Sequence, residues 1–473
     1  MWKPILKKFA IIATFLTIIS NILIFTYPSL HPTRCSWRCS TRTNEIDVSS
    51  LSLFERITYY SNRYFHDVKE QLFNDNKGEL NVDDEDDIHL LAFGDPQIKG
   101  IWHNTPYKSR LDIYGNDYYL GHIYSMMQRR LHPSHVAILG DLFSSQWIGD
   151  SEFFNRTTRY MNRIFKRDTT TWLKDLKERE HDENGQYRVD WSKWADQFKA
   201  NAASKNFSFG YNDVYSWDPE NENYLFINLT GNHDVGYSGD ATYQHMARYH
   251  EVFGKDNFWI EYETDTNHPW RIVVLNSLLL EGPALQPEFI ENNWEFLYQL
   301  FERRFNGSTV LLTHVPLYKE EGLCVDGPLF RYYPDDYKPE PYKKNLLRSQ
   351  NHLGEAVTNK VLNLVFDNDK PGIILNGHDH EGCETSYNRI NGTWFATRDV
   401  DQTSDFHVKE YTVRSMMGEF NGNTGLVTGH FDKNTMTWNW YFTLCPFGLQ
   451  HFWWFAKASA IITGFVWSLV FLI

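Results

Sequence analysis

The sequence predicts a layered α/β domain with an apolar, membrane-spanning helix at each end of the chain. Five short apolar runs have the length of β-strands and end in Gly, Asp, Asn or His; they lie at 88–97, 135–143, 224–234, 308–318 and 371–380. Segments of helical composition separate these runs, and such alternation is typical of α/β folds. The two ends are the most apolar parts of the chain.

The N-terminal apolar run predicts an uncleaved anchor over residues 1–27. Phe9 to Tyr27 has no charged residue, and a helix needs about 20 residues to cross the hydrocarbon core of a membrane. Cleavage as a signal peptide is the alternative, but "FTYPSLHP" offers no small-residue cleavage site. Lys3, Lys7 and Lys8 precede the run, so the N-terminus is expected in the cytosol and the following domain in the lumen.

The segments between the ends divide into a stem and a main domain. Residues 28–87 are expected to form a lumenal stem, with a helical patch over 52–73 and an acidic boundary at 83–87. The main domain is predicted over 88–432. A long polar interval at 146–222 separates the second strand from the third, and it predicts an insertion of surface helices near the site.

Residues 433–473 are expected to form a juxtamembrane segment and a second spanning helix. Phe452 to Ile473 contains one charged residue, Lys457, whose long side chain can reach the interface. Trp453 and Trp454 suit the headgroup level. A lipid-anchor attachment signal is the alternative, but it requires small residues and a polar spacer where residues 446–454 are bulky.

Composition limits the partners of the domain. Sixty acidic residues against 46 basic ones give a formal charge of −14, which argues against a nucleic-acid partner because phosphates require a basic face. Aromatic residues make up 16% of the chain. They suit sugar-facing or membrane-interface surfaces, or equally a large aromatic core.

Glycosylation sequons and cysteines fit an exocytoplasmic domain. Five N-glycosylation sequons begin at Asn155, Asn206, Asn228, Asn306 and Asn391. Asn228 is expected in a buried strand and therefore unmodified. Five cysteines are too few for a disulfide scaffold. Cys35 and Cys39 follow the first span, and Cys324 and Cys383 each follow a polar strand end. We expect pairing of Cys35 with Cys39 and of Cys324 with Cys383. Cys445 would then have no partner.

The polar residues at the five strand ends predict a metal site. A single Asp after a strand is usually a cap and a single His is usually structural, but ligands of open α/β sheets gather at the carboxyl ends of strands. The set is Asp95, Gln97, Asp141, Asn232, His233, His314, His378 and His380. Carboxylate, amide and imidazole groups without a thiolate predict two divalent ions, with manganese favoured and iron or zinc as alternatives. Two ions ~3.5–4 Å apart can hold the attacking and leaving oxygens of a phosphoryl displacement.

At these residues the chain resembles the calcineurin-like metallophosphoesterases. The blocks D-x-H, GD, GNH, H and GHxH of that family are matched by Asp95-Pro96-Gln97, Gly140-Asp141, Gly231-Asn232-His233, His314 and Gly377-His378-Asp379-His380. The resemblance covers roughly 88–432 and implies a four-layer sandwich, in which helices flank two β-sheets.

The resemblance also implies the role of each residue. It assigns the first metal to Asp95, Gln97, Asp141 and His380, and the second metal to Asp141, Asn232, His314 and His378. Asp141 would bridge the two ions. The resemblance implies that His233 orients the phosphate and protonates the leaving alkoxide.

Two residues depart from the family pattern. Gln97 stands where most members have a ligating His, and Ser144 stands where many have an Asp that supports the catalytic His. Because an amide oxygen is a weaker ligand than imidazole, the first metal is expected to bind more loosely. Asp234 is expected to take over part of the orienting role of the missing carboxylate.

A narrower resemblance concerns the segments 313–324, 377–384 and 411–425 together with the two terminal spans. They look like the lumenal phosphodiesterases that remodel glycosylphosphatidylinositol (GPI) anchors, including the mammalian enzyme and its fungal relatives. This implies removal of ethanolamine phosphate from a mannose, the second one, in the endoplasmic reticulum membrane, which promotes export of anchored proteins. The implied partners are the GPI glycan, the membrane and cargo receptors of export. Cys324 and Cys383 lie in two of these segments, which favours their pairing.

Two other functions are compatible with the motifs. One is a general lumenal phosphoesterase that acts on lipids or nucleotides. The other is a catalytically weak cargo-binding factor, suggested by Gln97 and Ser144. Retention of Asp141 and His233, which a pseudoenzyme would be expected to lose, favours an active enzyme.

Overall fold

The computed structural model describes residues 2–31, 33–38, 87–167, 188–210, 224–448 and 450–473, with isolated positions between 52 and 65. Most of the predicted helical patch at 52–73 and of the acidic run at 83–87 therefore lies outside the described residues, as does Cys39.

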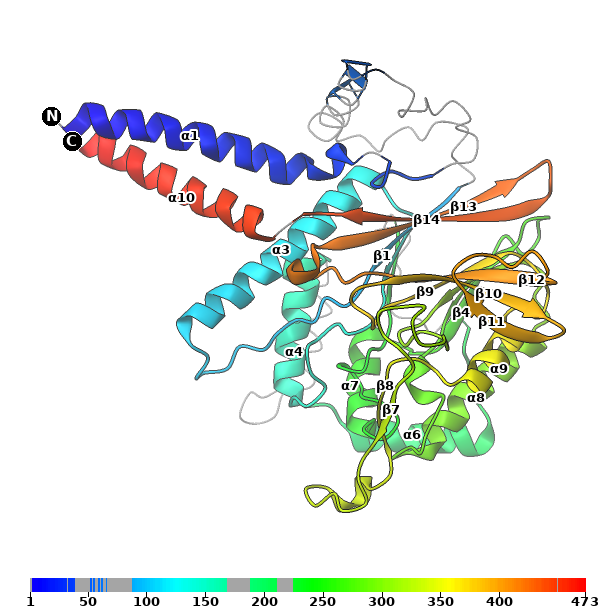
Figure 1. The fold of residues 1–473 in the computed structure, drawn as a ribbon. Coiled ribbons are helices and arrows are strands. Elements are labelled where there is room, and N and C mark those ends of the chain that lie inside the picture. The colour runs from blue at the N-terminus through cyan, green and yellow to red at the C-terminus, as the bar shows by residue number, and fades with distance from the viewer. Residues whose placement is uncertain are drawn as a thin grey trace.

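Two β-sheets form the centre of the domain (Figure 1). The first has the order β14-β13-β1-β2-β3. Its strands are β1 (Ile88–Phe93), β2 (His135–Ile138), β3 (Leu225–Asn228), β13 (Asn423–Asp432) and β14 (Thr437–Pro446). β1, β2 and β3 are parallel, and β13 pairs with β1 in antiparallel fashion. All residues of the three parallel strands are buried, which explains their continuous apolar sequences.

The second sheet has the order β11-β10-β12-β9-β6-β5-β4. Its strands are β4 (Phe258–Tyr262), β5 (Trp270–Val274), β6 (Ser308–Leu312), β9 (Gly372–Asn376), β10 (Cys383–Ile390), β11 (Thr393–Thr397) and β12 (Phe406–Thr412). β5, β6, β9 and β12 are parallel. A small separate hairpin pairs β7 (Phe330–Tyr332) with β8 (Leu347–Gln350).

Apolar side chains from both sheets meet in a common core. Leu90 and Ala92 of the first sheet and Val310 and Leu312 of the second belong to one buried cluster. Helices cover the outer faces, and they are α3 (Tyr107–Leu131), α4 (Asp150–Arg159), α6 (Trp191–Ser204), α7 (Tyr243–Phe253), α8 (Pro287–Glu302) and α9 (Glu355–Val365). The predicted sandwich of two sheets flanked by helices is confirmed.

Local sequence sets several helix boundaries. The side chain of Asp190 accepts a hydrogen bond from the backbone N–H of Lys193 and caps α6, and Thr242 caps α7 in the same way. Pro287 occupies the first turn of α8, where no backbone donor is needed. Short helical turns are η1 (Tyr27–Leu30), the π-helical η2 (Tyr160–Ile164), η4 (Ser277–Leu279), η5 (Pro341–Lys343) and η6 (Gly418–Phe420).

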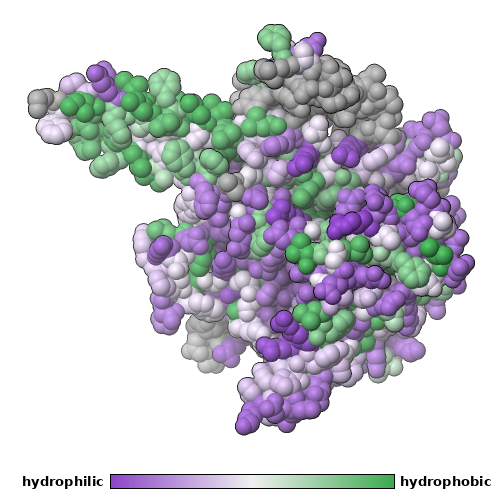
Figure 2. All heavy atoms as spheres, in the orientation of Figure 1, coloured by the Kyte–Doolittle hydropathy of each residue, from purple (hydrophilic) through white to green (hydrophobic). Residues whose placement is uncertain are grey.

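The terminal helices α1 (Trp2–Thr26) and α10 (Gln450–Leu472) lie side by side and project from the domain (Figure 1). Hydrogen bonds join Thr17 to Thr463 (2.9 Å) and Trp467 to Thr14 (2.9 Å). Only 17% and 22% of their most apolar windows are buried, so they are not core helices of the domain. Figure 2 shows their apolar surface on the projecting arm. They are long and apolar enough to cross a membrane and indicate a membrane protein.

The first sheet extends beyond the boundary predicted after residue 432. The ten residues of β14 pair with β13 along their whole length. Trp438, Trp440, Phe442 and Leu444 of β14 contact the core between the sheets. The segment between β13 and α10 is therefore part of the folded domain, because alternate side chains of β14 cover its core.

The proposed pairing of Cys35 with Cys39 is wrong. Cys35 forms a disulfide with Cys445, across a sequence separation of 410 residues. The physical reason is that β14 brings Cys445 to the base of α10, beside the segment that leaves α1. The bond thus links the domain-proximal ends of the two terminal helices. A second disulfide joins Cys324 to Cys383, the other couple named from the sequence.

The acceptor asparagines differ in exposure. Asn155, Asn206, Asn306 and Asn391 are exposed. Asn228 ends β3, is 9% exposed and accepts a hydrogen bond from the buried hydroxyl of Tyr160. The structure thus confirms that Asn228 lies in a buried strand.

We predict that His135 makes the fold sensitive to acid. Its ring is buried between the sheets, and its nitrogens lie 2.9 Å from Ser134 Oγ and 3.0 Å from Tyr262 Oη. Burial lowers the pKa of His135 to about 4, below the ~6.5 of an unfolded chain. The unfolded state therefore binds more protons between these values, and stability falls as pH drops from 6.5 toward 4, by up to about 3 kcal/mol from this group.

The test compares wild type with His135→Gln in denaturant unfolding at pH 7 and pH 4.5. The decrease in the free energy of unfolding from pH 7 to pH 4.5 should be smaller in the variant than in wild type, even if the variant is less stable at pH 7. An equal loss in both proteins would contradict the assignment.

Candidate metal centre

Five loops bring the candidate ligands together at the carboxyl ends of the parallel strands. These loops follow β1, β2, β3, β6 and β9, and thus come from both sheets. All eight residues named from the sequence lie in these loops. Carboxyl ends of parallel strands share one edge of a sheet, which is why residues so far apart in sequence meet.

The loop backbones adopt unusual conformations at the ligand positions. Asp95, Gln97, Asp141 and His378 have positive φ angles of 43°, 42°, 49° and 73°. A non-glycine residue in this region costs on the order of 1 kcal/mol or more, and such strain concentrates at functional sites. Gly231 is required by close approach, because a Cβ there would lie 1.9 Å from the backbone nitrogen of Asp141.

Asp95, Asp141 and His380 form the first group of candidate ligands. One ligand atom from each lies within 4.8 Å of the others. Gln97 closes this group: its Nε2 donates to Asp141 Oδ2 at 3.0 Å and lies 3.2 Å from His380 Nε2. The amide would have to turn by half a rotation to present its oxygen to an ion here.

Asn232, His314 and the other oxygen of Asp141 form the second group. His314 Nδ1 donates to the carbonyl of Leu139 at 2.7 Å, which leaves the lone pair on Nε2. That nitrogen lies 3.0 Å from Asn232 Oδ1 and 3.4 Å from Asp141 Oδ1. Burial lowers the pKa of His314, so the ring is neutral and three lone pairs converge without a proton between them.

His378 is placed beside both groups. Its backbone N–H donates to the carboxylate of Asp95, and its Nε2 lies 3.1 Å from the carbonyl of Gln350 and 3.4 Å from Tyr237 Oη. Burial lowers the pKa of His378 to about 3. With Nε2–H donated to Gln350, Nδ1 is free to bind a metal, the arrangement in which a carbonyl fixes the tautomer of a ligating histidine.

The buried carboxylates of the site favour the binding of cations. Burial, and then repulsion by Asp141, raise the pKa of Asp95 well above its ordinary value. Burial would also raise the pKa of Asp141, but His314 and His233 hold it lower. Buried carboxylates with neutral imidazoles and amides fit divalent ions. When bound, such ions stabilise the charge on a phosphoryl group and generate a nucleophile from water at neutral pH.

His233 lies at the rim rather than within the ligand groups. Its backbone N–H donates to Asp141 Oδ1 at 2.8 Å, its Nε2 is 3.7 Å from Asp141 Oδ2, and its side chain is 38% exposed. A substrate can therefore reach this imidazole, as a proton donor to a leaving group requires.

Asp234 and Ser144 have clear structural roles beside the site. The carboxylate of Asp234 accepts hydrogen bonds from the backbone N–H groups of Gly231, Leu142 and Phe143. It therefore ties two ligand loops together rather than orienting His233, contrary to the expectation from the sequence. Ser144 Oγ accepts a hydrogen bond from Arg156 at 3.1 Å.

Sequence reasoning missed Arg156 and Gln350. Arg156, on α4, is 2% exposed and also donates to the carbonyl of Ile98, so it supports the loop that carries Gln97. Its pairing with Glu152 four residues earlier resembles an ordinary surface helix pair. Gln350 acts through its backbone carbonyl, which leaves no signal in the sequence.

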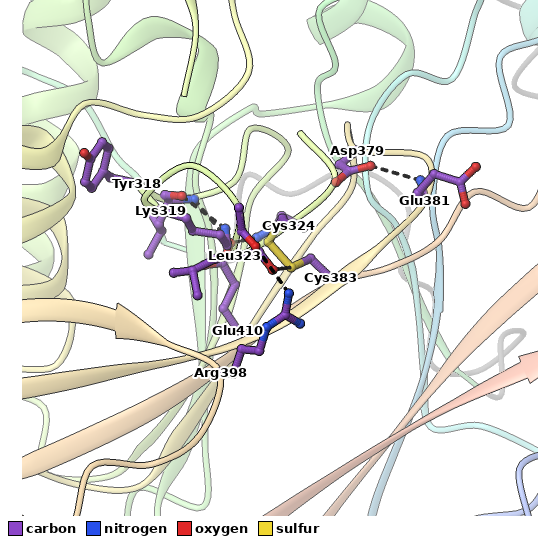
Figure 3. Close-up of a disulfide and its surroundings, with 12 residues drawn as sticks. Tyr318, Lys319, Leu323, Cys324, Asp379, Glu381, Cys383, Arg398 and Glu410 are labelled. Carbon is purple, nitrogen blue, oxygen red and sulfur yellow. Dashed lines mark hydrogen bonds and ion pairs between the residues drawn. A yellow bond between two sulfur atoms is a disulfide. The ribbon is translucent and has the colours of Figure 1, made fainter. Parts of the chain in front are cut away.

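A disulfide joins Cys324 to Cys383, and Figure 3 shows this bond with its surroundings. Cys383 lies three residues after His380, so the bond ties the His378–His380 loop to the segment after β6. Beside it, the buried Lys319 forms an ion pair with Glu410 at 3.0 Å. Arg398 donates to the carbonyl of Gly322 at 3.4 Å. These contacts restrict the loop that presents two candidate ligands.

Comparison with known proteins places this site in a family. The chain is 62% identical over 479 residues to Protein TED1 of Saccharomyces cerevisiae, covering 99% of each protein. It is 26% identical over 179 residues to metallophosphoesterase 1 of Xenopus laevis, covering 33% of this chain and 42% of that protein. A solved structure of a putative 5'-nucleotidase from Staphylococcus aureus aligns at 12% identity, TM-score 0.31, over 76% and 54% of the two chains. No family model matches the chain.

The chain belongs to the calcineurin-like metallophosphoesterase superfamily and is a phosphoesterase. Within that class it is a homologue of the yeast protein TED1 over its whole length. Membership implies that divalent metal ions are its cofactors.

We predict that Gln97→His tightens metal binding at the first group. The amide now donates a hydrogen bond where an imidazole lone pair would face Asp141 and His380. We expect about tenfold tighter binding of one ion, equivalent to ~1.4 kcal/mol. Metal content per chain, measured by elemental analysis across a series of buffered Mn²⁺ concentrations, gives the affinity. Unchanged or weaker binding would show that Gln97 does not limit this site.

Proposed function

We propose that this phosphoesterase hydrolyses the phosphodiester that joins ethanolamine to the second mannose of the GPI anchor. The catalytic domain acts at the lumenal face of the endoplasmic reticulum membrane, and removal of the branch promotes export of GPI-anchored proteins. Its two ions are manganese, in keeping with a ligand set of carboxylate, amide and imidazole.

The observation that carries the proposal is the position of Asp141. Its Oδ1 lies 3.4 Å from His314 in the second group, and its Oδ2 lies 3.0 Å from Gln97 in the first. One carboxylate thus faces both groups, as the bridging ligand of a two-metal phosphoryl-transfer site must. A phosphodiester carries a single negative charge, which two divalent ions can neutralise even in a chain with net charge −14.

Three further features support the compartment and the substrate. Two disulfides favour an oxidising environment. Four of the five glycosylation sequons have exposed asparagines. Anchoring at both ends of the chain confines the site to the plane of the membrane, where the glycan of a lipid-anchored substrate projects, and so raises its effective concentration.

We predict the outcome of a glycan analysis in cells that lack this protein. Mass spectrometry of mature GPI glycans should show an extra ethanolamine phosphate on mannose, and anchored cargo should leave the endoplasmic reticulum more slowly. Wild-type protein should reverse both effects, and Asp141→Asn should reverse neither. Identical glycans in all strains would contradict the GPI assignment and favour a general lipid or nucleotide phosphoesterase. Rescue by Asp141→Asn would favour a cargo-binding factor.

A further inference from the structure

One face of α3 exposes large side chains at helical spacing. Tyr107, Leu111, Tyr114 and Tyr118 are four, three and four residues apart and are 42–76% exposed. Trp102, in the loop before the helix, is also exposed. Single exposed apolar residues are common on soluble domains, but a row along one helix face marks an interaction surface. We call these five residues the aromatic face of α3.

The middle of α3 contacts the base of both terminal helices. A Cβ on Gly115 would lie 1.7 Å from the ring of Trp454, so that ring lies directly on α3. His122 Nε2 lies 3.0 Å from the carbonyl of Ile24 in α1. Tyr119 donates to the carbonyl of Gly448, just before α10, at 2.7 Å. These contacts place α3 at the level where α1 and α10 leave the domain.

An apolar cavity lies at this junction. Its volume is about 180 Å³, and its lining includes Leu23 and Ile24 of α1, Tyr119 and His122 of α3, and Phe452 and Trp453 of α10. Burial lowers the pKa of His122 to about 4, so the ring adds no charge at neutral pH. α3 therefore continues the apolar surface of the two terminal helices.

The direction and chemistry of α3 fit a membrane interface. Figure 1 shows the N-terminal half of α3 projecting on the same side of the domain as α1 and α10. Tyrosine and tryptophan are enriched at the headgroup level of membranes. The guanidinium of Arg163 lies 4.9 Å from the ring of Tyr114 and 5.3 Å from that of Tyr118. Arg163 also forms an ion pair with the buried Asp117 at 2.8 Å, so it holds the two rings in place at the surface.

We propose that the aromatic face of α3 lies in the headgroup region of the bilayer that α1 and α10 cross, as a third membrane contact. The bilayer is favoured over a protein partner because the face is continuous with two helices that themselves require lipid. Residues 98–106 connect Gln97 directly to α3. The contact therefore fixes the orientation of the domain and holds the metal loops next to the membrane surface.

Photocrosslinking of the full chain tests this proposal. Benzoylphenylalanine replaces Tyr107, Leu111 or Tyr118, one position at a time. Each protein is reconstituted in phosphatidylcholine vesicles in which a trace of the lipid is radiolabelled. Phe25 of α1 serves as the positive control. Tyr342 and Phe395, which are also exposed but lie in the β7–β8 region and in β11, serve as matched negative controls.

We expect lipid adducts at all three α3 positions, at least fivefold above Tyr342 and Phe395 and comparable to Phe25. Adducts at Phe25 alone would overturn the proposal. Crosslinks from α3 to another protein, or to a segment of this chain, would overturn it as well, because they would identify a different occupant. The readout does not involve hydrolysis, so it is independent of the proposed GPI activity.

Discussion

Asp141→Asn is expected to lower the turnover of a phosphodiester by about 10³-fold or more and to reduce the bound metal below two ions per chain. The substitution keeps the size of the side chain and one oxygen, but it removes the charge that two ligand groups share. Metal-ion stabilisation of a phosphoryl transition state amounts to several kcal/mol, and ~4 kcal/mol corresponds to about 10³-fold in rate.

The structure indicates why one residue should affect both ions. Asp141 Oδ1 lies 3.4 Å from His314 Nε2, which also contacts Asn232. Asp141 Oδ2 accepts a hydrogen bond from Gln97, whose amide also lies beside His380. Asp141 Oδ1 also accepts the backbone N–H of His233 at 2.8 Å. An amide oxygen at Oδ1 would preserve that hydrogen bond, so the loop should keep its conformation while the metals are lost.

Asp379→Asn is the matched control. Asp379 lies between His378 and His380, but its carboxylate accepts a hydrogen bond from the backbone N–H of Glu381 at 3.0 Å (Figure 3) and is not part of the group formed by Asp95, Asp141 and His380. It should retain two ions and turnover within a few-fold of wild type. Elemental analysis of each purified protein measures the bound metal, and a steady-state assay measures the turnover. Wild-type turnover in Asp141→Asn would refute the two-metal assignment.

The sequence predicts the site better than it predicts the frame around it. The strand ends at Asp95, Asp141 and His314 were identifiable because each apolar run stops at a polar residue. Adjacent strands in the sheets, however, come from distant parts of the chain, as β13 beside β1 shows. No local pattern encodes that pairing, because it results from burying two sheet faces against each other.

Two errors have the same physical origin. The sequence suggests Cys39 as the partner of Cys35 because both follow the first span, whereas the fold brings Cys445 to Cys35. β14 lies within residues 433–473, which the sequence predicts to be a juxtamembrane segment and a spanning helix, whereas the fold pairs it with β13. Its period-two alternation of Trp438, Trp440, Phe442 and Leu444 was the signal that could have identified a strand covering the core.

The role of Gln97 shows what a motif leaves undetermined. The motif gives the residue type and predicts a weak ligand, but it does not say which end of the amide faces the site. In the structure the nitrogen faces Asp141 and His380. Its partners come from the loops after β2 and β9, so only the assembled loops define this orientation.

His233→Gln is expected to slow the hydrolysis of an alkyl phosphodiester by ~10²–10⁴-fold, the usual contribution of a positioned general acid. An alkoxide such as that of mannose is a poor leaving group and needs a proton as the bond to phosphorus breaks. Nitrophenolate is stable without one, so bis(p-nitrophenyl) phosphate should be hydrolysed at a rate much closer to wild type. The comparison of the two substrates isolates proton donation from binding.

The position of the imidazole makes this test specific. His233 contacts Asp141 through its backbone N–H, and its half-exposed ring belongs to neither ligand group. The variant should therefore keep both ions and the unfolding temperature of wild type, which separates it from Asp141→Asn. If both substrates slow equally while metal content is unchanged, His233 orients the phosphate but does not protonate the leaving group. The acid would then have to be another group that reaches the same rim. If neither substrate slows, His233 has no part in the reaction, and the charge on the leaving oxygen must be stabilised by the metal ions alone.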